Sequence, residues 1–185
     1  MSKLPVQGCI GNHDVPLGDK SDTFLECWPY PYEADHYWSF DYGPVHVAVI
    51  DQFTDEMWSA PPDSSARQIE WLRRDLRENE RPWTIVLLHI PIREDHTYGG
   101  GWDARLVATR LLSALQHEEV DLLVCGHEHV HAFGETGGIP QLTMGSASDR
   151  DGTPSFYIYN VSATTLTVTA YSPQGTAIDV VSVER

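Results

Sequence analysis

The stretch Asp121 to His131, DLLVCGHEHVH, constrains the fold of this chain more than any other part of the sequence. Its apolar run, Leu122 to Cys125, is typical of a buried strand in a parallel sheet. Gly126 ends the run, and histidines follow at alternate positions: His127, His129 and His131. If the backbone stays extended past Gly126, alternate side chains point to one side and the imidazoles converge. Open α/β folds place their sites at such strand ends, although a polar loop with solvated histidines remains an alternative.

Two further apolar segments are also followed by residues that can bind a metal. Leu4 to Ile10, a predicted strand, precedes Asn12 and His13, and the predicted strand 83–88 precedes His89. Imidazole nitrogens together with an amide or carboxylate oxygen suit Zn, Mn, Fe, Co or Ni better than Ca. Three such strand ends in one small domain therefore predict a transition-metal site.

The remaining pattern predicts one layered α/β domain over residues 1–185. The apolar positions Ile69, Leu72 and Leu76 have the spacing of an amphipathic helix that ends near Asn79. Asp103 is a candidate N-cap for a second helix that reaches about His117. Further strands are predicted at residues 36–42, 45–51, 140–144, 156–161, 164–171 and 177–183. Alternating strands and helices followed by a run of strands are typical of a layered β-sandwich flanked by helices.

Composition excludes several partners. The net charge of −15 argues against a nucleic-acid surface and against an anionic membrane, because both attract clusters of Lys and Arg. No apolar run approaches the ~18 residues of a membrane span, and residues 1–5 have no signal-peptide pattern. The three cysteines lack the spacing of a disulfide framework, so we expect buried free thiols and a cytoplasmic location: Cys9, Cys27 and Cys125.

Three motifs resemble those of the calcineurin-like metallophosphoesterases. They are Gly-Asn-His-Asp at 11–14, Leu-Leu-His-Ile-Pro at 87–91 and Gly-His-Glu-His at 126–129, and they stand in the order found in that family. Residues 37–51 and 68–72 are also similar to its purple acid phosphatase-like and cyclic-nucleotide phosphodiesterase-like branches. The resemblance covers nearly the whole chain, and the ordered trio is more specific than any one motif.

The resemblance implies a role for each matching residue. Asn12, His89 and His127 would be ligands of one metal, His129 a ligand of a second metal, and His13 the catalytic histidine that steadies the phosphoryl group or protonates the leaving oxygen. A metal-bound hydroxide would then attack the phosphorus of a small phosphomonoester or phosphodiester. A complete member of the family holds two metal ions, and their charge allows an acidic protein to bind phosphate.

The chain also departs from this family. The motifs Asp-x-His and Gly-Asp-x-x-Asp/Asn should precede Gly11, but residues 1–10 contain neither. Gly18 to Asp22 spells the second motif in the wrong place, and we interpret it as a coincidental turn. The fold is therefore expected to be N-terminally incomplete and to hold at most one transition metal tightly. The uncovered N-terminal edge would favour a homo-oligomer.

Two other functions compete with this hypothesis. His127-Glu-x-x-His131 matches the start of a zinc-protease signature, which requires both histidines on one helix. The glycines at 126 and 134 argue against a helix there, and position 137 is Gly where a third histidine is expected. The other alternative is a catalytically impaired fragment or a non-catalytic metal-binding or interaction module. Metal content distinguishes that module from an enzyme.

Overall fold

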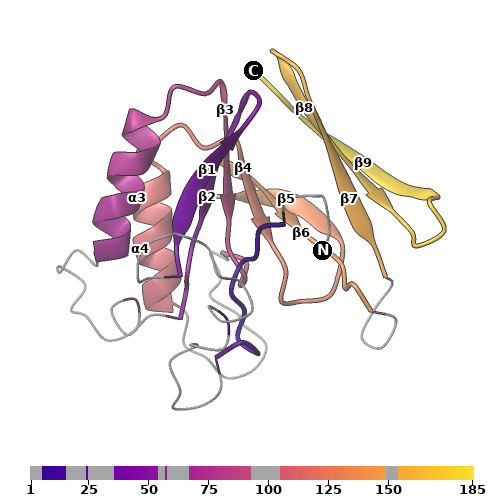
Figure 1. Cartoon of the computed structure of the whole chain (residues 1–185), viewed down its shortest axis with the longest axis horizontal. Coiled ribbons are helices and arrows are strands. Elements are labelled where there is room, and N and C mark those ends of the chain that lie inside the picture. The colour runs from indigo at the N-terminus through magenta and orange to yellow at the C-terminus, as the bar shows by residue number, and fades with distance from the viewer. Residues whose placement is uncertain are drawn as a thin grey trace.

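A computed structural model of the chain describes residues 6–15, 24, 36–53, 57, 67–92, 105–148 and 154–185. Two β-sheets lie face to face, and two helices cover the outer face of the larger sheet (Figure 1). We call the six-stranded sheet, with the strand order β1-β2-β3-β4-β6-β5, sheet A. Sheet B has three strands in the order β7-β8-β9. The chain therefore has the layered α/β fold that the sequence predicts.

Sheet A is mixed, and its central strands are parallel. The turn at Gly43, where φ is +57°, joins two antiparallel strands, β1 (Trp38–Tyr42) and β2 (Val45–Val49). The parallel strands β2, β3 (Trp83–Leu87) and β4 (Leu122–Cys125) follow, and β6 (Ile139–Thr143) continues the parallel set beside β4. The edge strand β5 (Ala132–Thr136) pairs antiparallel with β6. The carboxyl ends of β2, β3 and β4 therefore lie at one edge of sheet A.

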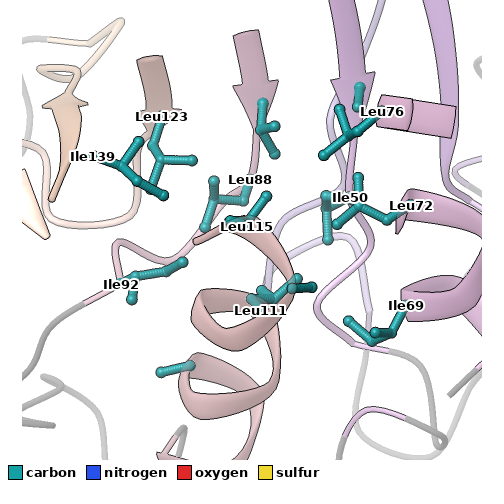
Figure 2. Close-up of a cluster of buried hydrophobic side chains, with 14 of the residues drawn as sticks. Ile50, Ile69, Leu72, Leu76, Leu88, Ile92, Leu111, Leu115, Leu123 and Ile139 are labelled. Atoms are coloured by element: carbon teal, nitrogen blue, oxygen red, sulfur yellow. The ribbon is translucent and has the colours of Figure 1, made fainter. Parts of the chain in front are cut away.

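The helices α3 (Arg67–Glu78) and α4 (Arg105–Leu115) bury their apolar faces against sheet A. Ile69, Leu72 and Leu76 recur at intervals of three and four residues, so they share one face of α3. Figure 2 shows these side chains beside Leu111 and Leu115 of α4. Burial of each such side chain contributes about 1.5–3 kcal/mol, and this layer therefore fixes the outer face of sheet A.

A second core lies between the two sheets. The strands β7 (Phe156–Val161), β8 (Thr165–Tyr171) and β9 (Ala177–Glu184) form an antiparallel meander. Leu166 and Val168 of β8 are buried against β2, β3 and β4. Beside β7 an open apolar groove of about 760 Å³ lies between the sheets, lined on the side of sheet A by β1 to β4. Self-association through an uncovered N-terminal edge stays a prediction.

Most of the predicted strands are confirmed, and two predictions are wrong. The described part of the predicted first strand, residues 6–10, forms no strand, although Ile10 is buried in the core between the sheets. Strand β5 was not predicted, because the glycines at 134 and 137 resemble a loop. The proposed cap Asp103 and the motif at 18–22 lie outside the described residues.

The helices and the cysteines of the described residues can be compared with the predictions from composition. None of its helices is long and apolar enough to cross a membrane. Cys9 and Cys125 are free thiols, and burial raises the pKa of the Cys9 thiol to about 12. Cys27 lies outside the described residues.

Candidate metal centre

The three motif segments meet at the edge of sheet A where the parallel strands end. His89 follows β3 and His127 follows β4, and two hydrogen bonds hold these strand ends together. Leu88 N donates to Val124 O at 3.0 Å, and Gly126 N donates to His89 O at 3.0 Å. Parallel pairing therefore places the two histidines side by side, as expected for residues at the carboxyl ends of neighbouring parallel strands.

Three side-chain atoms that can ligate a metal lie close together at this edge. Nε2 of His89 lies 2.8 Å from Oδ1 of Asn12 and 3.2 Å from Nδ1 of His127. The two imidazole rings are 5.1 Å apart and nearly perpendicular. All three side chains are partly buried and keep some access to solvent.

The spacing and chemistry of these atoms fit a transition metal. Two ligands bound to one metal at about 2.1 Å lie roughly 3.0–3.4 Å apart, close to the observed separations. The ligand set of two imidazole nitrogens and one amide oxygen suits Zn, Mn, Fe, Co or Ni. Asn12, His89 and His127, which the sequence assigns to one metal, are therefore the residues that would hold it.

Gly11 allows the segment that carries Asn12 to approach His89 closely. A Cβ atom at position 11 would lie 2.9 Å from Cε1 and 3.0 Å from Nδ1 of His89. A tight turn fixes this segment, because Asp14 Oδ2 accepts a hydrogen bond from Gly11 N at 2.9 Å and Asp14 N donates to Gly11 O at 3.0 Å. A side chain larger than that of glycine would displace the His89 ring.

His89 stays neutral at physiological pH. Burial and, to a smaller extent, the neighbouring His127 lower its pKa to about 4, although the Asp14 carboxylate opposes this shift. His13 and His129 also lower it. A neutral imidazole keeps a nitrogen lone pair available, so protons compete little with a metal for His89 at neutral pH.

Two predicted site residues, His13 and His129, have exposed side chains. In the described part of the chain, neither forms a hydrogen bond with the cluster of Asn12, His89 and His127. The expectation of extended backbone after Gly126 is wrong, because His127 and His129 have φ values of +66° and +57°. Left-handed backbone costs a residue other than glycine about 1–2 kcal/mol, and it persists only where the surrounding structure holds it. The side chain of His129 is exposed, whereas that of His127 is partly buried beside His89.

A second metal position is not evident in the described residues. Among them, no three side chains drawn from His, Cys, Asp and Glu are grouped closely enough to hold a metal ion. The cluster described above depends on the amide of Asn12 as its third donor. The role of His129 as ligand of a second metal, and that of His13 in catalysis, stay predictions.

His131 does not join the other histidines. Its Nδ1 lies 3.1 Å from Tyr157 Oη and its Nε2 lies 2.8 Å from Asp179 Oδ2, and both partners belong to sheet B. The described backbone from Gly126 to His131 is irregular and continues into β5, so His127 and His131 do not share a helix. The zinc-protease alternative is therefore wrong.

Gln52 supports the site and was not found from the sequence. Its side-chain amide pairs with the backbone of Ile90 in both directions, because Nε2 donates to Ile90 O at 2.9 Å and Oε1 accepts from Ile90 N at 2.6 Å. The adjacent Phe53 ring lies 6.0 Å from the His89 ring. A buried glutamine after a strand has no periodic signal, so sequence patterns do not reveal this contact.

Comparisons with known proteins show the family of the chain. The family model for the calcineurin-like phosphoesterases matches residues 2–131. Purple acid phosphatase 15 of Arabidopsis thaliana is 26% identical in an alignment of 141 residues that covers 70% of this chain and 25% of that protein. Acid phosphatase type 7 of Danio rerio is 27% identical in an alignment of 152 residues that covers 69% of this chain and 33% of that protein.

A solved structure shows the same fold. The structure described as GAP50, the anchor in the inner membrane complex of Plasmodium, superposes with a TM-score of 0.60 at 18% identity. The match covers 82% of this chain and 55% of that one. The chain spans only a quarter to a third of the length of the two phosphatases. The family match includes all three motifs that converge at the edge of sheet A, and the chain belongs to the calcineurin-like phosphoesterase family.

Proposed function

We propose that this protein is a metal-dependent phosphoesterase that hydrolyses small phosphate monoesters or diesters. The observation that carries this proposal is the convergence of Asn12 Oδ1, His89 Nε2 and His127 Nδ1 in a member of a phosphoesterase family. Two relatives are phosphatases by name, which supports a phosphate ester as substrate. The net charge of −15 would repel such a substrate unless a cation compensates it locally.

In this proposal, Asn12 and His89 bind the metal and His13 transfers a proton. A bound transition metal supplies a nucleophile by lowering the pKa of water and neutralises charge on the phosphate oxygens. The neutral ring of His89 and the uncharged amide of Asn12 bind this ion and leave its positive charge undiminished. The exposed His13, next to Asn12 in the sequence, would protonate the leaving oxygen.

A hydrolysis assay with defined metals tests the proposal. Protein stripped with a chelator is loaded separately with Mn²⁺, Zn²⁺, Co²⁺, Ni²⁺ or Fe²⁺ and assayed with p-nitrophenyl phosphate and bis(p-nitrophenyl) phosphate. We expect hydrolysis of one or both esters that depends on the metal and is lost in His127→Ala. The matched control is His117→Ala, which removes an exposed histidine beyond the end of α4. Equal rates in the stripped and loaded proteins would contradict the proposal.

A second candidate is a non-catalytic metal-binding or interaction module. The observation that favours it is that His129 is exposed and that, among the described residues, no group of three or more His, Cys, Asp or Glu side chains could hold a metal ion. Such a module would bind one metal stoichiometrically and hydrolyse neither ester with any of the five metals. The same assay, combined with elemental analysis of the loaded protein, therefore separates the two functions.

A further inference from the structure

The loop that carries His127 and His129 is held at both ends. Its first residue, Gly126, donates its N–H to the carbonyl of His89, and Glu128 N donates to Gly126 O at 2.7 Å. Its last residue, His131, is hydrogen-bonded through both ring nitrogens to sheet B. The positive φ values of His127 and His129 lie between these two attachments. The second attachment is outside the three family motifs.

Both ring nitrogens of His131 have hydrogen-bond partners in sheet B. The Asp179 carboxylate only accepts, so Nε2 of His131 donates to it at 2.8 Å. Nδ1 of the ring lies 3.1 Å from the Tyr157 hydroxyl. That hydroxyl accepts a hydrogen bond from Gly145 N at 2.8 Å. Contacts at both ring nitrogens therefore fix the orientation of the His131 ring.

Three neighbouring residues of sheet B form the surface that the His131 ring contacts. Tyr157 of β7 pairs with Ala170 of β8, and Ala170 pairs with Asp179 of β9. Partners in antiparallel register point to the same face, so the three side chains form one row. The central residue is the buried Ala170, whose small side chain leaves room between the larger two. The His131 ring stacks at 5.7 Å from the Tyr157 ring at one end of this row.

We propose that His131 is a positioning residue and that the row Tyr157, Ala170 and Asp179 sets the metal affinity of His127 by holding the loop 126–131. This inference rests on the proposed function, because it concerns the same site. The family match ends at residue 131, so all three residues of the row lie beyond it. Sheet B thereby contributes to the metal centre without supplying a ligand.

The test measures Co²⁺ affinity of the full chain by calorimetry. Partners that orient metal ligands typically change affinity 10–100-fold when removed, and we expect this loss in His131→Ala, Tyr157→Phe and Asp179→Ala. Asp179→Asn keeps an acceptor oxygen and should recover most of the affinity. Ala170→Leu removes no hydrogen-bonding group but fills the space between Tyr157 and Asp179, so it should weaken Co²⁺ binding as His131→Ala does. Ser182→Ala, which removes a hydroxyl from the exposed side of β9, is the control and should bind Co²⁺ like wild type.

Hydrogen exchange provides a readout that does not depend on metal. In the metal-free protein, the amides of residues 127–131 should exchange faster in His131→Ala, while those of β3 and β4 stay protected. Folded His131→Ala and Asp179→Ala with unchanged Co²⁺ affinity would overturn the inference, and so would a wild-type chain that binds no Co²⁺. A chain that binds Co²⁺ with this dependence on His131 but hydrolyses no phosphate ester would overturn the proposed function alone.

Discussion

Nε2 of His89 lies 2.8 Å from Oδ1 of Asn12, although the two residues are 77 positions apart in the sequence. Neither residue is in a strand. His89 follows the buried strand β3, Asn12 follows the buried residues Ile10 and Gly11, and the close approach requires glycine at position 11. The contact therefore depends on three separate parts of the chain: the turn at 11–14, the end of β3 and the adjoining end of β4.

The histidines of the cluster should be indispensable for metal binding. His89→Ala and His127→Ala each remove one of three converging donors, so each folded variant should lose tight metal binding at this position. Elemental analysis after dialysis measures this, with His117→Ala as the control for loss of a histidine elsewhere. Unchanged metal content in both variants would show that these histidines are not ligands.

The two glycines beside His89 should differ in their tolerance of alanine. A Cβ at Gly11 would lie 2.9 Å from the His89 ring, whereas a Cβ at Gly126 would come no closer than 4.0 Å, to Nδ1. We expect Gly11→Ala to weaken Co²⁺ binding about 10–100-fold by displacing the ring, and Gly126→Ala to bind like wild type. Calorimetric titration of the two variants in parallel provides the comparison. Equal affinity in both would mean that the turn at 11–14 adapts without moving His89.

The sequence predicts the cluster well because its determinants are local. A buried strand followed by an imidazole identifies His89 and His127, and the bounds of β4 are those predicted. The segment before Asn12 forms no strand, so Asn12 is identified only by its place in the Gly-Asn-His-Asp motif. Parallel pairing then brings His89 and His127 together without further information. The order of the three motifs is the part of the pattern that is specific to the family.

The errors have a common physical cause. The left-handed backbone of His127 and His129 is imposed by contacts at both ends of the loop, and no local signal predicts it. The partners of His131 are 26 and 48 residues away in another sheet, so its role follows from tertiary packing alone. Residues 6–10 belong to a segment with the apolar composition of a strand, but they form no strand, and among them only Ile10 is buried.

His13 should affect catalysis without affecting metal content. Its side chain is exposed, and its proposed role is that of a proton donor and not that of a metal ligand. His13→Ala should keep its metal and lose activity, typically ~10²–10⁴-fold for a general acid. Steady-state rates and elemental analysis of the same preparation test this. Parallel loss of metal and activity would make His13 a ligand instead.

A histidine at the opposite end of β2 should make stability depend on pH. His46 is buried, and its ring nitrogens lie 2.8 Å from Asp41 Oδ1 and 2.9 Å from Asp75 Oδ2. Burial lowers the pKa of His46, but the hydrogen bonds to Asp75 and Asp41 outweigh it and the net shift is upward. Both carboxylates only accept hydrogen bonds, so the ring donates from both nitrogens as an imidazolium.

The sign of the effect follows from this raised pKa. The folded state binds the proton more tightly than the unfolded state, so the stabilisation is fully present below the unfolded pKa of about 6.5. It is lost as pH rises through the higher folded pKa. Urea unfolding between pH 6 and pH 9 should show a decrease in the free energy of unfolding that is absent in His46→Gln and kept in His117→Gln. A pH profile that is the same in His46→Gln and wild type would exclude His46 as the cause.

The last prediction concerns the number of metal ions. Two dications in one site repel each other, and a bridging carboxylate normally compensates this repulsion. In the described residues the cluster contains one amide and two imidazoles but no carboxylate, and the Asp14 carboxylate accepts a hydrogen bond from Gly11 N. His129 alone cannot replace the three protein ligands of a typical catalytic metal site. We therefore expect at most one tightly bound transition metal per chain and a low rate of ester hydrolysis. Native mass spectrometry of protein loaded with Zn²⁺ counts the ions directly. Two tightly bound ions in a monomer would mean that residues outside the described part of the chain complete the centre.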